Sequence, residues 1–189
     1  IPLLFDVLKE KKNYRDPWIL LGFAYLNVEK YQDAVEALEQ AKKLDSLKAE
    51  THFYLGLGYF GLNDLQNAAN ELELAKKYGY EPVIQIDQKL AEIYLQLKEY
   101  PKSAMSFENV LALNSTDVNY FIKPMWIYME RLNSPEKALA LAKKAQQANP
   151  KLAMSYNLLG WASIGTNHLD DAEGYLKKAL AIDPNLDAI

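Results

Sequence analysis

One spacing recurs along the whole sequence. Positions 22, 56, 91, 126 and 160 hold Gly, Gly, Ala, Trp and Gly, and the steps between them are 34, 35, 35 and 34 residues. Two further series, mostly of alanine, begin at Ala34 and at Ala41 and follow the same four steps. A fixed period in this range is typical of chains that stack one structural unit many times. We therefore expect an array of repeats.

Each repeat contains two segments with apolar residues at helical spacing. In the first repeat they cover about residues 16–28 and 32–44, and Trp18, Leu21 and Tyr25 mark the apolar side of the first segment. Turn-forming residues separate the segments. Asp16-Pro17 has the form of a helix N-cap followed by proline at the first helical position. The pattern predicts an all-α chain of antiparallel helix pairs.

The glycine inside the first segment of several repeats needs an explanation. Glycine in a helix interior costs about 1 kcal/mol relative to alanine. We expect that Gly22 on the first helix and Ala34 on the second leave room for the two helices to approach closely. The packing gained would then offset the lower helix propensity.

The order of a large residue, Leu-Gly, Tyr, Ala, a large apolar residue and Ala resembles the tetratricopeptide repeat family. In the first repeat the matching residues are Trp18, Leu21, Gly22, Tyr25, Ala34, Leu38 and Ala41. In the second repeat they are Leu55, Gly56, Tyr59, Ala68, Leu72 and Ala75. In the fifth they are Tyr156, Leu159, Gly160, Ala172, Leu176, Ala179 and Pro184. The resemblance implies an α-solenoid that winds as a right-handed superhelix.

The same spacing defines the expected organisation. Five repeats form one solenoid over 15–186, with bounds 15–48, 49–82, 84–117, 119–152 and 153–186. Residues 1–14 are interpreted as the second helix of a truncated preceding repeat, with Leu4 and Val7 in its core, and 187–189 as the start of a following helix.

The fourth repeat departs most from the pattern. Trp126 stands where a small residue is expected, and Pro124 lies inside the first helix, where proline removes a backbone hydrogen bond. Val83 and Val118 are interpreted as the extra residues behind the two 35-residue steps. These features predict a bend or a register shift around the fourth repeat.

Composition narrows the classes of function. The net charge of −4 argues against a general nucleic-acid binder, and the lack of cysteine excludes disulfides and thiolate metal sites. No apolar run is long enough to span a membrane, so we expect no membrane insertion by this segment. Absence of cysteine favours the cytoplasm without excluding an export compartment.

No motif in the chain predicts catalysis. The stretch "GLGYFG" at 56–61 spells a dinucleotide-binding pattern, but that motif works only between a strand and a helix, and here it lies within a helix of the repeat. His52 takes the large-residue position of Trp18 and is interpreted as a packing residue, while His168 lies in a turn. We expect no enzymatic activity, no cofactor and no metal site.

In the tetratricopeptide repeat family, the first helices of each pair line a concave groove. The resemblance places ten residues of this chain there: Ile19, Phe23, Phe53, Leu57, Phe60, Glu92, Lys123, Arg131, Asn157 and Trp161. The apolar members can either pack internally or bind an apolar peptide or helix, and both interpretations stay open. Family members that clamp a chaperone's C-terminal carboxylate use lysine and asparagine where this chain has Ile19 and Phe23.

The predicted function is a protein-interaction scaffold that binds a peptide or helix of a protein partner. One alternative is a regulatory or docking region of a larger enzyme or membrane-associated protein. Another is a module for homo-oligomeric assembly. Such assembly could occur through uncapped ends of the repeat array. Leu176, Leu180 and Ile182 lie on a last helix that no complete helix follows, so we expect another copy of the chain to cover them.

Overall fold

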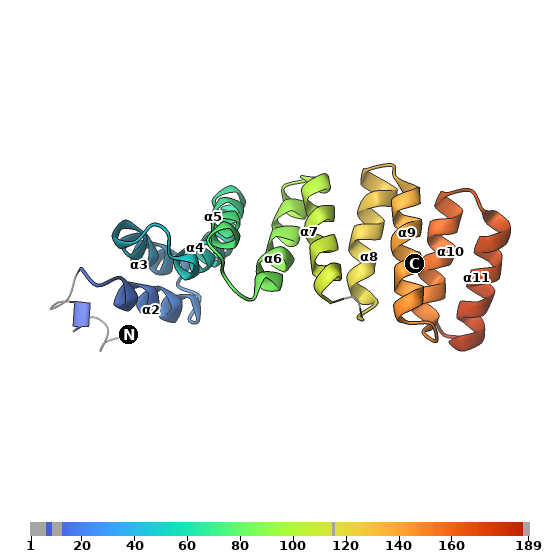
Figure 1. The fold of residues 1–189 in the computed structure, drawn as a ribbon, viewed down its shortest axis with the longest axis horizontal. Coiled ribbons are helices and arrows are strands. Elements are labelled where there is room, and N and C mark those ends of the chain that lie inside the picture. Colours follow the sequence, from blue (N-terminus) through green and yellow to red (C-terminus); the bar gives the residue numbers. More distant parts are fainter. Residues whose placement is uncertain (1–6, 9–12, 115, 187–189) are drawn as a thin grey trace. The chain divides into compact units, whose positions relative to one another are not determined.

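The computed structural model describes residues 7–8, 13–114 and 116–186, and these residues form helices and turns without a strand (Figure 1). The chain divides into two compact units, residues 1–98 and 99–189. The helices of the first unit are α2 (Arg15–Leu26), α3 (Tyr31–Leu44), α4 (Ala49–Gly61), α5 (Leu65–Lys77) and α6 (Val83–Gln96). Those of the second are α7 (Tyr100–Leu113), α8 (Asn119–Trp126), the π-helix η1 (Ile127–Arg131), α9 (Pro135–Ala148), α10 (Ala153–Gly165) and α11 (Leu169–Ile182). The predicted all-α fold class is confirmed, and the division into five repeats stays a prediction.

The turns between helices carry one residue with a positive φ at regular intervals. These residues are Glu29, Asn63, Lys98, Asn133 and Asn167, with φ of 57°, 60°, 59°, 44° and 60°. Their spacing of 34, 35, 35 and 34 residues is the spacing of the sequence series. A residue with this left-handed backbone conformation therefore follows the first helix of every predicted repeat.

The expected close approach at the central glycine is confirmed. A Cβ on Gly56 would lie 2.6 Å from Leu72 Cγ, and one on Gly160 would lie 2.6 Å from Leu176 Cγ. The equivalent neighbour of Gly22 is Leu38. The facing residue is thus a leucine of the second helix, one turn beyond the alanine that the sequence suggested.

The glycines of 56–61 face two different helices. Gly56 packs against Leu72 of α5, whereas a Cβ on Gly58 would lie 2.8 Å from Val35 Cγ2 of α3. Gly61 faces the ring of Tyr31, also on α3. Helix α4 therefore approaches a neighbour closely on both sides, which explains three glycines in one helix.

The predicted register shift in the fourth repeat takes the form of η1. Leu132 N donates to Ile127 O at 3.0 Å, an i→i+5 bond that adds one residue to the turn. Because of this insertion, fully buried Met125, rather than half-buried Trp126, occupies the position of Gly56 and Gly160. The extra residue of this repeat thus lies in η1, which corrects the assignment to Val118.

The large side chain at Met125 has a small counterpart on the second helix of the same pair. Ala142 stands where the other pairs have a large residue, namely Leu38, Leu72, Phe107 and Leu176. Both Met125 and Ala142 are fully buried. The exchange of large and small between the two helices conserves the volume of the core.

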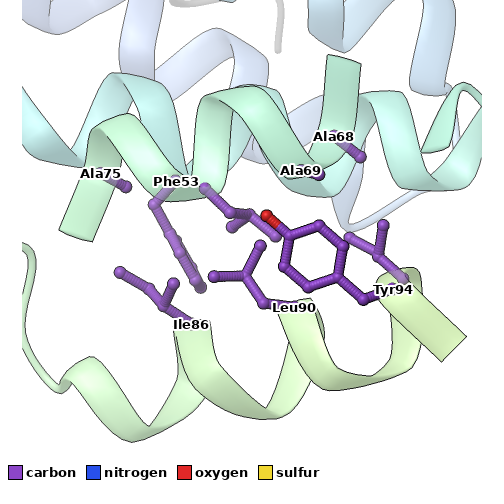
Figure 2. Packing of buried hydrophobic residues seen from close by; sticks show 9 residues of the cluster. Phe53, Ala68, Ala69, Ala75, Ile86, Leu90 and Tyr94 are labelled. Atoms are coloured by element: carbon purple, nitrogen blue, oxygen red, sulfur yellow. The ribbon is translucent and has the colours of Figure 1, made fainter. Parts of the chain in front are cut away.

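One buried cluster of the first unit lies between α4, α5 and α6, as Figure 2 shows. Phe53 of α4 reaches toward Ile86 and Leu90 of α6, and its ring stacks on Tyr80 with centroids 4.0 Å apart. The buried members of the cluster are Phe53, Ala68, Ala69, Leu72, Ala75, Ile86, Leu90, Ile93 and Tyr94.

Two predictions about the start of the chain are wrong in detail. Residues 7 and 8 are helical, but Val7 is 37% exposed, whereas Leu8 is 4% exposed and packs with Leu21 and Ala37. Helix α2 begins at Arg15, so Asp16 lies inside its first turn and is not the N-cap. Leu4 and residues 187–189 lie outside the described residues.

Candidate protein-binding surface

The sequence-predicted residues of the first unit divide into buried and accessible ones. Ile19 and Phe53 are buried, which favours internal packing, one of the two interpretations of the apolar positions, over partner contact. Phe23 is 42% exposed, and Leu57, Phe60 and Glu92 are half-buried. Accessible members therefore come from all three first helices of this unit, α2, α4 and α6.

An accessible aromatic surface follows from these positions. It consists of Phe23 on α2, Tyr54, Leu57 and Phe60 on α4, and Lys89 on α6, and we call it the first-unit aromatic surface. The rings of Phe23 and Tyr54 are 5.2 Å apart, and Lys89 Nζ lies 4.5 Å from the centroid of the Phe60 ring. Residues 54, 57 and 60 share one side of α4 because they are three apart. The surface thus combines rings, an aliphatic side chain and one cation.

Charges at the edge of this surface are arranged in local pairs. Lys89 Nζ contacts Glu92 Oε2 at 2.8 Å, and Lys48 Nζ contacts Glu50 Oε2 at 2.8 Å. The hydrogen bond from Lys48 lowers the pKa of Glu50. Sequence reasoning missed Tyr54 and Lys89, because the family's groove positions do not include theirs.

A polar network lies at the junction of α3, α4 and α5. His52 is buried, with Nδ1 2.6 Å from Glu71 Oε2 and Nε2 2.9 Å from the carbonyl oxygen of Ser46. Lys42 donates to the other oxygen of Glu71 at 2.9 Å. Burial alone would lower the pKa of Lys42, but its hydrogen bonds to Glu71 and Glu39 raise it. His52 is therefore a buried hydrogen-bonding residue, and its interpretation as a simple packing residue is incomplete.

A tyrosine–glutamate hydrogen bond recurs between successive helix pairs. Tyr59 donates to Glu39 at 3.2 Å, and Tyr94 donates to Glu73 at 3.0 Å. In the second unit Tyr128 donates to Glu108 at 2.5 Å, and burial together with this bond raises the pKa of Tyr128. The tyrosine follows its glutamate by 20 or 21 residues each time, a signal that the sequence carries but that sequence reasoning missed.

The predicted residues of the second unit also differ in exposure. Asn157 is buried, so we do not include it in a contact surface, and Trp161 is half-buried. Lys123 and Arg131 are exposed. The Arg131 guanidinium carbon lies 4.7 Å from the Trp126 ring centroid and 5.7 Å from that of Tyr100.

Comparison with known families identifies the repeats. The tetratricopeptide repeat family profile matches residues 19–82, and a second tetratricopeptide repeat profile matches residues 153–186. The chain belongs to the tetratricopeptide repeat family. No curated protein matches it.

Solved tetratricopeptide repeat structures share the fold at low sequence identity. YrrB, described as a protein of this family with an unusual peptide-binding site, matches with a TM-score of 0.74 and 19% identity, over 96% of this chain and 93% of that chain. MamA matches with a TM-score of 0.69 and 19% identity, over 93% of this chain and 97% of that chain. A further crystal structure of MamA matches with a TM-score of 0.65 and 21% identity, over 87% of this chain and 95% of that chain.

Metal ligation and membrane crossing both depend on features that can be checked in the described helices of this tetratricopeptide repeat chain. Within the described ranges, no cluster of three or more histidine, cysteine or acidic side chains has an arrangement that could hold a metal ion. None of the helices in that part of the chain is both long and apolar enough to cross a bilayer.

Proposed function

We propose that this chain is a scaffold that binds an apolar peptide or helix of a partner protein through the first-unit aromatic surface. The observation that carries the proposal is the exposure of Phe23, which leaves 42% of a phenylalanine accessible beside the Tyr54 ring. Binding surfaces are enriched in aromatic side chains, and their energy is concentrated in a few of them.

The surroundings of Phe23 support this assignment. Phe53 stacks on Tyr80 beneath the surface, and Tyr54, Leu57 and Phe60 pack against the same core cluster. The accessible side chains thus rest on a close-packed core, so little conformational freedom is lost when a peptide binds. YrrB, which shares the fold, is described as having a peptide-binding site, and a binding role without catalysis is the role we propose here.

Peptides selected from a random display library on the intact chain test the proposal. Phe23→Ala and Leu57→Ala should each weaken the binding of the selected peptides at least tenfold, the effect of removing a hot-spot residue. Leu44→Ala on α3 is the matched control, because Leu44 is also 42% exposed but lies outside the surface. Circular dichroism should show unchanged helicity in all three variants. Equal loss of binding in the Leu44 control, or loss of helicity in step with binding, would contradict the assignment.

Self-association is a second candidate function. Helix α11 exposes three large apolar side chains, Leu169, Leu180 and Ile182. Leu169 occupies the position of Tyr31, whose ring packs on Gly61 of the next helix, and of Pro135, which packs near Gly165. We propose that the side of α11 that carries Leu169 and Leu180 is covered by a second copy of the chain.

A further inference from the structure

The π-helix η1 creates a local arrangement that an uninterrupted α-helix would not. Residues five apart lie on different sides of an α-helix, but the i→i+5 bonding of a π-helix brings them close to one another. Trp126 and Arg131 are five apart, and the guanidinium of Arg131 lies 4.7 Å from the Trp126 ring centroid. The ring centroid of Tyr100, at the start of α7, lies 5.7 Å from the carbon of the same guanidinium. The rings orient Arg131 without neutralising its charge.

The charge of Arg131 is not matched within the described part of the chain. No acidic side chain there pairs with it, although Arg131 is exposed. The other arginine of the sequence, Arg15, is by contrast bound to Asp16 and Asp45, and these two bonds raise its pKa. Lys123 is also exposed and lies three residues before Trp126, on the same side of α8.

We propose that Arg131, supported by Trp126 and Tyr100, binds a carboxylate of an acidic peptide segment, with Lys123 contributing a second positive charge. A guanidinium presents parallel N–H donors that match a carboxylate with two hydrogen bonds. Because the aromatic rings already hold the guanidinium, less side-chain entropy is lost when the carboxylate binds. Pi-helical turns occur often at functional sites, which agrees with this assignment.

An acidic peptide fits this site better than a nucleic acid. A phosphate backbone needs a row of cations along its path, whereas the site offers one arginine and one lysine on a chain of net charge −4. The site shares no residue with the first-unit aromatic surface, so either assignment can fail while the other stands.

The two arginines allow an internally controlled test by NMR. The side-chain Nε–Hε signals of Arg15 and Arg131 are recorded while the intact chain is titrated with a short capped peptide of alternating glutamate and leucine. Glutamine replaces glutamate in the control peptide, and inorganic phosphate is titrated separately. The glutamate peptide should shift the Arg131 signal and the Trp126 indole signal but leave the Arg15 signal in place. The glutamine peptide should bind at least tenfold more weakly.

Two variants separate guanidinium geometry from charge. Arg131→Gln should abolish the response, and Arg131→Lys, which keeps the charge but not the paired donors, should weaken it about tenfold. Backbone amide spectra verify that both variants stay folded. The proposal is overturned if both peptides bind equally, if the two arginine signals shift together, if phosphate binds more tightly than the glutamate peptide, or if no shift occurs.

Discussion

At the scale of single residues, two positions of the repeat restrict the amino acid in different ways, one through its backbone conformation and the other through the space for its side chain. The turn after each first helix requires a positive φ, and the chain places asparagine there three times but Glu29 and Lys98 in the other two turns. Asparagine tolerates this conformation better than a longer side chain does. In the first, second and fifth helix pairs the central helix position instead requires the absence of a side chain, because a leucine of the paired helix occupies the space.

The turn at Glu29 provides a prediction of increased stability. A left-handed conformation costs a residue with a Cβ about 1–2 kcal/mol, and glycine avoids this cost but loses roughly 0.5–1 kcal/mol through its greater freedom in the unfolded chain. Glu29→Gly should therefore raise the free energy of unfolding by about 0.5–1 kcal/mol. Asn63→Gly, the control at the equivalent turn, should change it by less than about 0.5 kcal/mol. Urea denaturation of both variants checks the difference, and equal effects would refute the role of φ.

The helix glycines predict opposite effects for one substitution at two positions. Gly56→Ala places a Cβ 2.6 Å from Leu72 Cγ, and Leu72 is fully buried and has no free space to enter. The variant should lose about 1–3 kcal/mol of stability through overpacking. Gly174→Ala meets no atom within 4 Å and should gain about 1 kcal/mol from helix propensity. Thermal unfolding that moved in the same direction for both variants would argue against the close contact.

At the scale of elements, the tyrosine–glutamate bonds join one helix pair to the next. Tyr94 of α6 reaches back to Glu73 of α5, as Tyr59 of α4 reaches back to Glu39 of α3. A sequence search for one recurring spacing can find the helix pairs, but such a bond depends on two residues in different repeats. Its period becomes visible only when the packing of α3 against α4 and of α5 against α6 is known.

Removing one of these hydroxyl groups tests the coupling between pairs. Tyr94→Phe leaves the ring in the core but removes the donor to Glu73, so it should cost about 1.5–3 kcal/mol, as expected for a hydrogen bond to a charged acceptor. Tyr31→Phe is the control, because the ring of Tyr31 packs on Gly61 while no hydrogen bond of its hydroxyl is found among the described residues. That variant should stay within about 0.5 kcal/mol of the parent. Guanidinium denaturation measures both, and a loss in the Tyr31 variant as large as that in Tyr94 would contradict the assignment.

At the scale of the whole molecule, the sequence predicts the helix pairs much better than the binding surface. The repeat spacing is sufficient for the pairs because the turns and the central glycine contacts obey it. It fails at Trp126, because a π-helix inserts a residue that the spacing alone places at Val118. The spacing also does not predict that Phe53 and Asn157 are buried, since a position on the groove side of a helix can still be covered by the neighbouring helix or loop, as Tyr80 covers Phe53.

The exposed side of α11 leads to a prediction for the intact chain in solution. Leu169 is 60% exposed and Leu180 is 50% exposed, and burying such side chains contributes roughly 1.5–3 kcal/mol each. If a second copy covers them, the sedimentation coefficient should rise with concentration, and Leu180→Lys should lower the association constant at least tenfold. Leu113→Lys on α7 is the control, because Leu113 is 58% exposed but lies on another helix. A chain that sediments as a monomer at every concentration, or a Leu113 variant that dissociates as readily, would show that α11 stands in solvent without a partner copy.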